Sequence, residues 1–175
     1  FMKEHTIIIN GMSKTYSMTG WRIGYLAAPI AIAKAISSMQ SHTTSNACSI
    51  SQYASVTALT DPEGDKFIDK MQKVFDDRRK TMIELLADVE GIECITPKGA
   101  FYVFINVRNL FGKSSDGVVI NGSLSFADCA LKKGIALVPG IAFGNDDCIR
   151  LSYAISKEDI VEGIRRFKEF VSELK

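Results

Sequence analysis

The segment IIINGMSKTYSMTGWRIGYLAAP, residues 7–29, places two short apolar runs on either side of a polar, glycine-containing loop. The runs at 6–9 and 23–27 are too short for helices, so they predict two buried strands joined by this loop. The loop carries Lys14 and, eight residues later, Arg22. A lysine directly after a strand is a candidate either to hold a nucleotide phosphate or to do covalent chemistry.

A phosphate-binding P-loop is the first alternative for this lysine. Its form is G-x-x-x-x-G-K-[ST], in which two glycines let the backbone wrap around the anion. Here Ser13 directly precedes Lys14, and Ile8 lies six residues before it. Because both glycines are missing, backbone N–H groups are not free to converge on a phosphate, and the sequence disfavours a P-loop.

Length and charge bound the classes of function. The 175 residues are 46% hydrophobic, enough for one domain or for a domain and part of another. With 21 Lys and Arg against 20 Asp and Glu, the net charge of +1 gives no electrostatic argument for nucleic acid or for an anionic membrane. We therefore expect a small-molecule partner. The chain starts at Phe1 with neither a signal pattern nor an apolar run of membrane-spanning length, and we expect it to be a piece of a longer protein.

The cysteines and histidines show no metal-binding pattern. His5 and His42 are isolated, so neither is proposed as a base or as a ligand, and no metal is expected. Four widely spaced cysteines lack C-x-x-C pairs and are predicted to be reduced thiols of a cytosolic protein: Cys48, Cys94, Cys129 and Cys148.

Periodicity predicts the elements of the rest of the chain. Helices are expected at 30–39, 50–59, 63–89, 124–133 and 156–175. Strands are expected at 92–96, 101–107, 136–138 and 148–153, with a Gly- and Ser-rich loop at 112–123. Ser45 and Asn46 are expected to supply a break and cap between the first two of these helices, and Ser156 before Asp159 is expected to open the last one.

The loop motif resembles a known family. The spacing of Lys14 followed by Thr-Gly-Trp-Arg-x-Gly at 19–24 closely resembles the cofactor-lysine segment of class I/II aminotransferases, the aspartate aminotransferase-like, fold-type I pyridoxal-phosphate enzymes. Further segments resemble the same family in the same order, so that the resemblance covers essentially the whole chain: 45–46, 51–54, 98–104, 138–140, 143–144 and 149–152.

This resemblance implies an α/β fold in two parts. Residues 1–60 would be the C-terminal part of the large pyridoxal-phosphate-binding α/β domain. Residues 61–175 would be an α+β small domain that begins with a long linking helix and has a short sheet covered by helices.

The resemblance also assigns roles in binding pyridoxal 5'-phosphate. Lys14 would form the Schiff base with the cofactor, since a primary amine condenses reversibly with a carbonyl, and once displaced it would act as the general base. Arg22 would bind the cofactor phosphate, which suits a guanidinium fork. Ser13 would add a hydroxyl to that phosphate, although a family serine often stands three residues before the lysine, where this chain has Gly11.

Arg150 is the fourth candidate residue. The run Ile149-Arg150-Leu151-Ser152 alternates as a half-buried strand does, so it projects a guanidinium from a rigid element. The resemblance implies that Arg150 grips the substrate α-carboxylate with two hydrogen bonds.

The implied activity is a ping-pong transfer of an amino group from an amino acid to a 2-oxo acid. Aspartate or aromatic amino acids are the expected donors, and the whole protein is expected to be a cytoplasmic homodimer. One alternative is a lyase or synthase of the same fold, because carbanion chemistry at the cofactor also leads to elimination. The other is a catalytically silent fragment that acts only as a structural or interaction domain.

Overall fold

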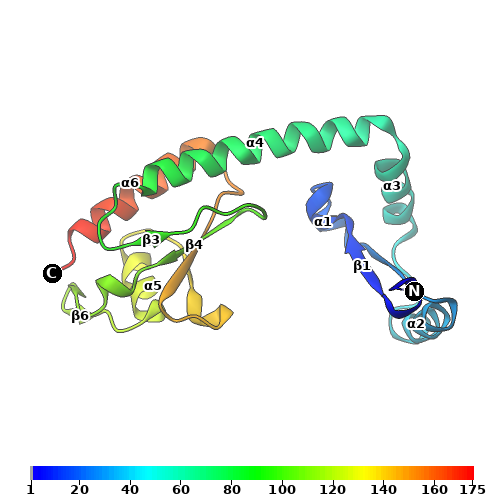
Figure 1. The fold of residues 1–175 in the computed structure, drawn as a ribbon, viewed down its shortest axis with the longest axis horizontal. Coiled ribbons are helices and arrows are strands. Elements are labelled where there is room, and N and C mark those ends of the chain that lie inside the picture. The colour runs from blue at the N-terminus through cyan, green and yellow to red at the C-terminus, as the bar shows by residue number, and fades with distance from the viewer. Residues whose placement is uncertain (1) are drawn as a thin grey trace. The chain divides into compact units, whose positions relative to one another are not determined.

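The computed structural model describes residues 2–175 and forms two compact units (Figure 1). The first unit ends at Gln72, and the second runs from Lys73 to Lys175. The division falls within the long helix α4 (Pro62–Leu86), which matches the amphipathic helix expected at 63–89. No helix in the described part of the chain combines the length and the apolar composition that a bilayer span requires.

The first unit is built on one strand pair. β1 (Ile8–Gly11) and β2 (Gly24–Ala27) pair antiparallel, with Ile8 opposite Ala27 and Gly11 opposite Gly24. Around this pair lie η1 (Met2–His5), α1 (Met12–Thr15), η2 (Thr19–Trp21), α2 (Ile30–Thr43) and α3 (Ser49–Thr60).

The predicted burial of these two strands is wrong. Ile8 is 58% exposed and Ile9 80% exposed, because β1 and β2 pair only with each other among the described residues. The first strand also begins two residues later than the apolar run. An apolar run thus marks a strand, but only a covering layer makes it a buried one.

The two longer helices of this unit lie where the periodicity predicted them, with a break between them. The break between α2 and α3 is present, and Ser45 takes a left-handed φ of 65° there. The N-cap residue of α3 is Cys48, which makes no side-chain capping bond. Ser45 directly follows Thr44, the C-cap residue of α2, and its left-handed φ is typical of the residue that ends a helix, so the break and cap expected between the two helices fall at the end of α2.

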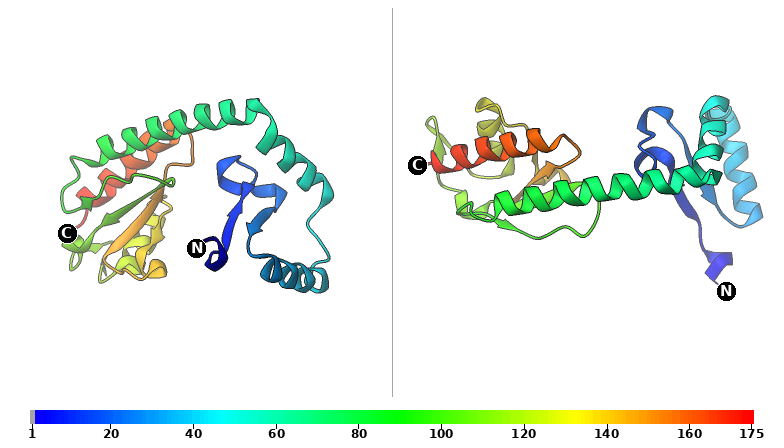
Figure 2. Two further views of the ribbon diagram at one scale, coloured as in Figure 1. Left: turned by 45° about the vertical axis from the view of Figure 1, so that its right-hand side comes forward. Right: turned by 90° about the horizontal axis from the view of Figure 1, so that it is seen from above.

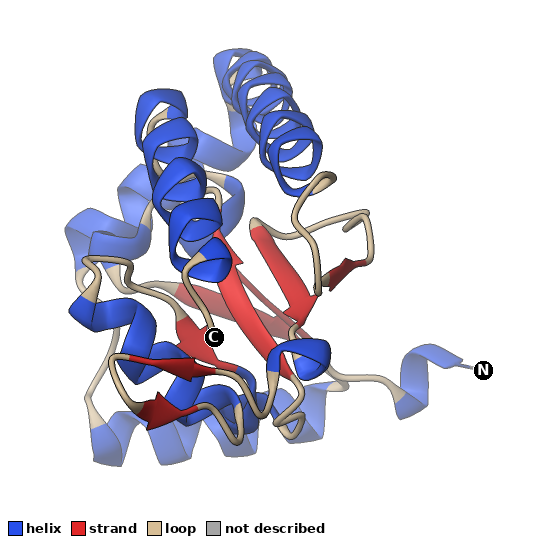
Figure 3. Ribbon diagram, turned by 90° about the vertical axis from the view of Figure 1, so that its left-hand side faces the viewer, coloured by secondary structure: helices blue, strands red, loops and turns tan. Residues whose placement is uncertain are grey.

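The second unit contains a four-stranded antiparallel sheet in the order β3-β4-β8-β7. Its strands are β3 (Glu93–Cys94), β4 (Tyr102–Asn106), β7 (Val138–Pro139) and β8 (Cys148–Ser152), drawn in red in Figure 3. The other elements are η3 (Arg108–Leu110), β5 (Ser114–Ser115), β6 (Val118–Val119), α5 (Ser123–Lys132), η4 (Gly140–Phe143) and α6 (Lys157–Ser172).

One face of this sheet forms the core with the helices. Alternate residues of the central strands are fully buried, including Val103, Ile105 and Ile149. They pack with Leu86 of α4 and with buried residues of α5 and α6. Because side chains alternate across a strand, the other face carries Tyr102, Phe104, Arg150 and Ser152.

Within this unit, α6 lies beside the C-terminal part of α4 in both views of Figure 2. Lys157 pairs with Asp77 at 2.9 Å, and Lys168 pairs with Asp88 at 2.5 Å. The predicted start of α6 is confirmed, since the Ser156 hydroxyl accepts a hydrogen bond from the Asp159 N–H at 3.0 Å.

The stretch at 112–123, predicted as a loop, contains a small hairpin. β5 and β6 pair antiparallel around Asp116 and Gly117, whose φ angles of 48° and 81° are left-handed. An Asp-Gly pair between two short strands is a strong signal for such a tight turn. The signal was present in the sequence, but strands of two residues are too short to show an alternating pattern.

Candidate active site

Three of the predicted residues lie in the connection between β1 and β2. Ser13 and Lys14 belong to α1, which starts directly after β1, and Arg22 stands two residues before β2. The Met12 N–H donates to the Ile23 carbonyl at 3.3 Å and closes this connection at its base. The antiparallel pairing therefore brings the three residues into one loop.

The backbone of this loop is unusual at Arg22. Its φ of 52° and ψ of 49° are left-handed, as is the φ of 53° at Ser17. Residues other than glycine adopt this conformation only at a free-energy cost, and such residues cluster at functional sites. Arg22 Nη1 donates to the Thr19 carbonyl at 3.0 Å, which uses one of the five N–H donors of a guanidinium. Lys14 and Arg22 are both exposed.

Gly24 lies opposite Gly11 at the end of the strand pair next to the loop, where the two backbones approach closely. A Cβ on Gly24 would lie 3.1 Å from the Asn10 carbonyl oxygen, closer than an ordinary contact. A Cβ on Gly11 would lie 3.4 Å from the Ile23 carbonyl oxygen. This is an ordinary van der Waals distance and Gly11 has an extended φ of −160°, so the tight contact in this strand pair is the one at Gly24.

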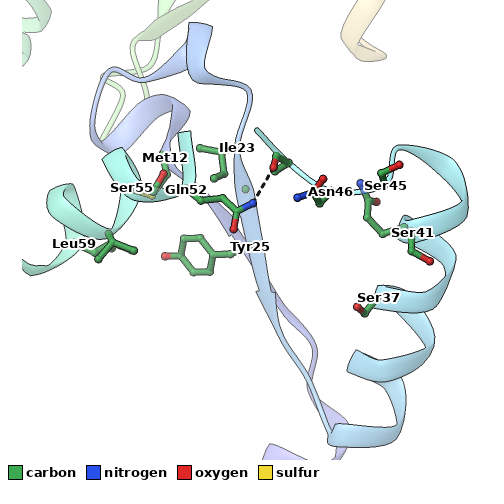
Figure 4. A pocket seen from close by; sticks show the side chains of 14 residues that line it. Met12, Ile23, Tyr25, Ser37, Ser41, Ser45, Asn46, Gln52, Ser55 and Leu59 are labelled. Carbon is green, nitrogen blue, oxygen red and sulfur yellow. Dashed lines mark hydrogen bonds between the residues drawn. The ribbon is translucent and has the colours of Figure 1, made fainter. Parts of the chain in front are cut away.

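A cavity of about 490 Å³ opens beside this strand pair within the first unit. Side chains of β2, α2 and α3 line it, and Met12 and Ile23 bring it next to the loop (Figure 4). Gln52 Nε2 donates to the Ala47 carbonyl at 2.8 Å across its rim. Ser13, Lys14 and Arg22 are not among its lining residues.

The fourth predicted residue, Arg150, lies on β8 in the second unit. It stands opposite Phe104 of β4 and Val138 of β7 on the face of the sheet away from the core. Its guanidinium carbon lies 4.2 Å from the ring centre of Tyr102 and 4.2 Å from that of Phe143. The prediction that a rigid strand projects this guanidinium is confirmed by the register.

Arg150 is half-buried, and the part of the chain that the structure describes offers it no anionic partner. Within the described residues it makes neither a hydrogen bond nor an ion pair. Several other arginines of the same unit pair with carboxylates, as Arg108 does with Asp147 at 2.9 Å, whereas Arg78 resembles Arg150 in lying over an aromatic ring, that of Phe75 at 5.6 Å. A partly desolvated guanidinium without a counter-ion is suited to receive an anion.

A hydrogen-bond network holds the segment that carries Phe143. Asp146 accepts from the Ser123 N–H at 2.9 Å and from the Ser123 hydroxyl at 2.6 Å, and that hydroxyl accepts from the Ile141 N–H at 3.1 Å. The hydroxyl bond, followed by the N–H bond, holds the pKa of the Asp146 carboxyl below its usual value. A Cβ on Gly140 would lie 2.2 Å from the Cys148 carbonyl oxygen, so η4 needs glycine at its first position.

The aromatic partners of Arg150 were not assigned by the sequence. Tyr102 and Phe143 fall within the segments 98–104 and 143–144 that resemble the family, and the sequence assigned neither of them a role. Alternation along 101–107 places Tyr102 and Phe104 on one face, but the approach of Phe143 depends on the path of η4. The described residues contain no cluster of His, Cys, Asp or Glu that could hold a metal ion, and the four cysteines are free thiols.

The fold and the loop together define a class of protein: an α/β protein with a lysine and an arginine displayed at a strand connection, and a helix-covered antiparallel sheet that presents a second arginine. The sequence matches the profile of the family Aminotransferase class I and II over residues 1–167. This chain belongs to the class I and II aminotransferase family.

Individual relatives agree with this assignment. A probable aspartate/prephenate aminotransferase of Aquifex aeolicus (strain VF5) is 40% identical over 174 residues, covering 99% of this chain and 43% of the relative. The crystal structure of an aspartate aminotransferase from Rhizobium meliloti matches with a TM-score of 0.93 and 38% identity, covering 99% of this chain and 43% of that one. An aromatic aminotransferase from Pyrococcus horikoshii OT3 matches with a TM-score of 0.88 and 36% identity, covering 98% and 44%.

These matches confirm the predicted α/β fold class. They also show that the chain spans less than half the length of the relatives that it matches.

Proposed function

We propose that this chain is the C-terminal portion of a pyridoxal-phosphate-dependent aminotransferase, which moves an amino group from an amino acid to a 2-oxo acid. Residues 1–60 would end the large domain, and residues 61–175 would form the small one. The observation that carries the proposal is the loop between β1 and β2, which displays the amine of Lys14 and the guanidinium of Arg22 in the family's spacing, with the Ser13 hydroxyl beside the amine.

The donor set of this loop fits pyridoxal phosphate. An amine matches an aldehyde, while a guanidinium and a hydroxyl match a phosphate dianion. When bound, the cofactor supplies an electron sink that makes the α carbon of an amino acid acidic.

Lys14 has two tasks in this proposal. Its Nζ holds the cofactor covalently, because a primary amine adds reversibly to an aldehyde. Once a substrate amine has displaced it, the Lys14 amine would act as the general base that takes the proton from the substrate α carbon.

Arg22 and Ser13 anchor the phosphate. The guanidinium donates paired N–H groups to the dianion, and the Ser13 hydroxyl adds a further donor. The left-handed backbone conformation of Arg22 gives its Cα–Cβ bond a direction different from that of a residue in a right-handed turn.

Arg150 binds the α-carboxylate of the amino acid and of the 2-oxo acid. The carboxylate is the one group that both substrates of the exchange share, so one fixed guanidinium serves both halves of the reaction. The lack of an anionic partner for this half-buried side chain among residues 2–175 supports the assignment.

The names of the relatives support the proposed donors. An aspartate/prephenate aminotransferase and an aromatic aminotransferase are among the matches. We propose aspartate or an aromatic amino acid as the donor, and a cytoplasmic homodimer as the whole protein.

Reaction products distinguish transamination from the lyase or synthase alternative. Full-length protein loaded with pyridoxal phosphate and given only an amino acid should form one equivalent of 2-oxo acid and then stop until a second oxo acid is added. Continuous release of an eliminated group would make the protein a lyase. Absence of both reactions, with no cofactor bound, would favour the silent interaction domain.

Arg150→Ala tests the carboxylate role in the same protein. Losing a two-bond contact between charged groups should cost about 2 to 5 kcal/mol in transition-state binding, at least about 30-fold in kcat/KM. Every α-amino acid should be affected by a similar factor, and simple amines far less. A loss confined to one acidic substrate would instead make Arg150 a reader of side chains.

A further inference from the structure

Arg150 is in contact with two aromatic rings. It makes no hydrogen bond within the described residues. Both ring centres lie 4.2 Å from the guanidinium carbon, well within the range of about 6 Å for an attractive cation–π contact. We propose that Tyr102 and Phe143 are positioning residues, which hold the Arg150 guanidinium in the orientation that receives a substrate carboxylate. This inference rests on the carboxylate role proposed for Arg150.

The first step of the argument concerns the directions of contact. Aromatic rings attract the face of a planar guanidinium, whereas its N–H donors point outward in the plane. Contacts through the rings therefore leave the donor edge available. A carboxylate uses that edge when it binds with two parallel hydrogen bonds.

The second step concerns entropy. A free arginine side chain loses about 2 kcal/mol of rotamer freedom when it is fixed. The chain orders Arg150 in advance, because Tyr102 lies on the neighbouring strand and Phe143 lies in η4, which the Ser123–Asp146 network holds. A guanidinium ordered before binding costs the substrate less affinity.

The third step is the contrast with Phe104, which stands directly opposite Arg150 in the register. Its ring packs edge-on against the ring of Phe143, with 6.3 Å between the centres. Among the described residues, it is not one of the rings in cation–π contact with the Arg150 guanidinium. Phe104 thus offers a matched control: the same residue type on the same face of the sheet.

Phe143→Leu in full-length, cofactor-loaded protein tests the inference. Removing one ring should raise KM for α-amino acids and 2-oxo acids about 2- to 30-fold with kcat nearly unchanged, as expected for a lost cation–π contact of about 0.5 to 2 kcal/mol. Simple amines without a carboxylate should react as before. Phe143→Tyr keeps a ring and should restore KM to within about 2-fold.

Two further variants make the result decisive. Phe104→Leu should leave KM within about 2-fold, and Phe143→Leu should add nothing when Arg150 is already Ala, because the positioned group is then absent. An equal effect of Phe104→Leu, or a KM unchanged by Phe143→Leu, would overturn the positioning role and leave the carboxylate role of Arg150 standing. Equal impairment of amino acids and simple amines by Arg150→Ala would overturn both.

Discussion

Arg22 combines an unusual backbone conformation with a proposed role in binding the cofactor phosphate. It holds a left-handed conformation, it is exposed, and its recorded hydrogen bond goes to a backbone carbonyl three residues earlier. The phosphate-binding role proposed for Arg22 would account for an exposed arginine in this conformation. The motif predicted the residue from its spacing, but the φ angle follows from the path of the chain and was not readable from the sequence.

Arg22→Leu should weaken binding of pyridoxal phosphate to the full-length protein about 10- to 100-fold, the cost of losing hydrogen bonds to a charged group. The cofactor-free protein should keep its unfolding temperature, because the exposed side chain makes few contacts. Titration of the cofactor and thermal unfolding without it measure the two effects. Arg22→Lys should give an intermediate affinity, since it keeps the charge and loses the fork.

Either of two results would remove Arg22 from the cofactor site. One is an unchanged affinity in Arg22→Leu. The other is a fall in the unfolding temperature of the cofactor-free variant, which would indicate a structural role instead.

Among the helices and strands, those with a strong periodic pattern were predicted well from the sequence, and the short strands were predicted poorly. The stripe of α4 and the Ser156 cap of α6 were readable because both depend on local spacing. β3, β5 and β6 have only two residues each, so they are too short to show an alternating pattern in the sequence. The contact between Phe143 and Arg150 could not be predicted for the same reason, because a 3-10 turn and not a repeating pattern brings the ring there.

The link between α5 and η4 should show a characteristic pH dependence. The folded state lowers the pKa of Asp146 through its bonds from Ser123, so the stabilising carboxylate form is present at neutral pH and is lost as the pH falls below about 4. Asp146→Asn should lower the unfolding temperature at pH 7, and the difference from the unmodified protein should shrink at pH 3. A difference that stays constant between these pH values would contradict the role of the charge.

At the scale of the whole molecule, the hydrophobic core lies in one unit. All members of the main buried cluster, from Met82 to Leu174, belong to residues 73–175. In residues 2–72, the buried apolar side chains are Met12 and Met18, while the isoleucines of β1 and Tyr53 of α3 are exposed. The sequence indicated buried strands in both parts because hydrophobicity alone does not reveal whether a covering layer is present.

The central claim, that Lys14 is the lysine that carries the cofactor, has a direct test. Full-length protein loaded with pyridoxal phosphate is reduced with borohydride and digested, and the modified peptide is identified by mass spectrometry. We predict that the label sits on Lys14, that Lys14→Ala abolishes it together with amino-group transfer, and that Lys98→Ala, a control at an exposed lysine of the second unit, retains it. A label on another lysine, or a full label in Lys14→Ala, would contradict the assignment.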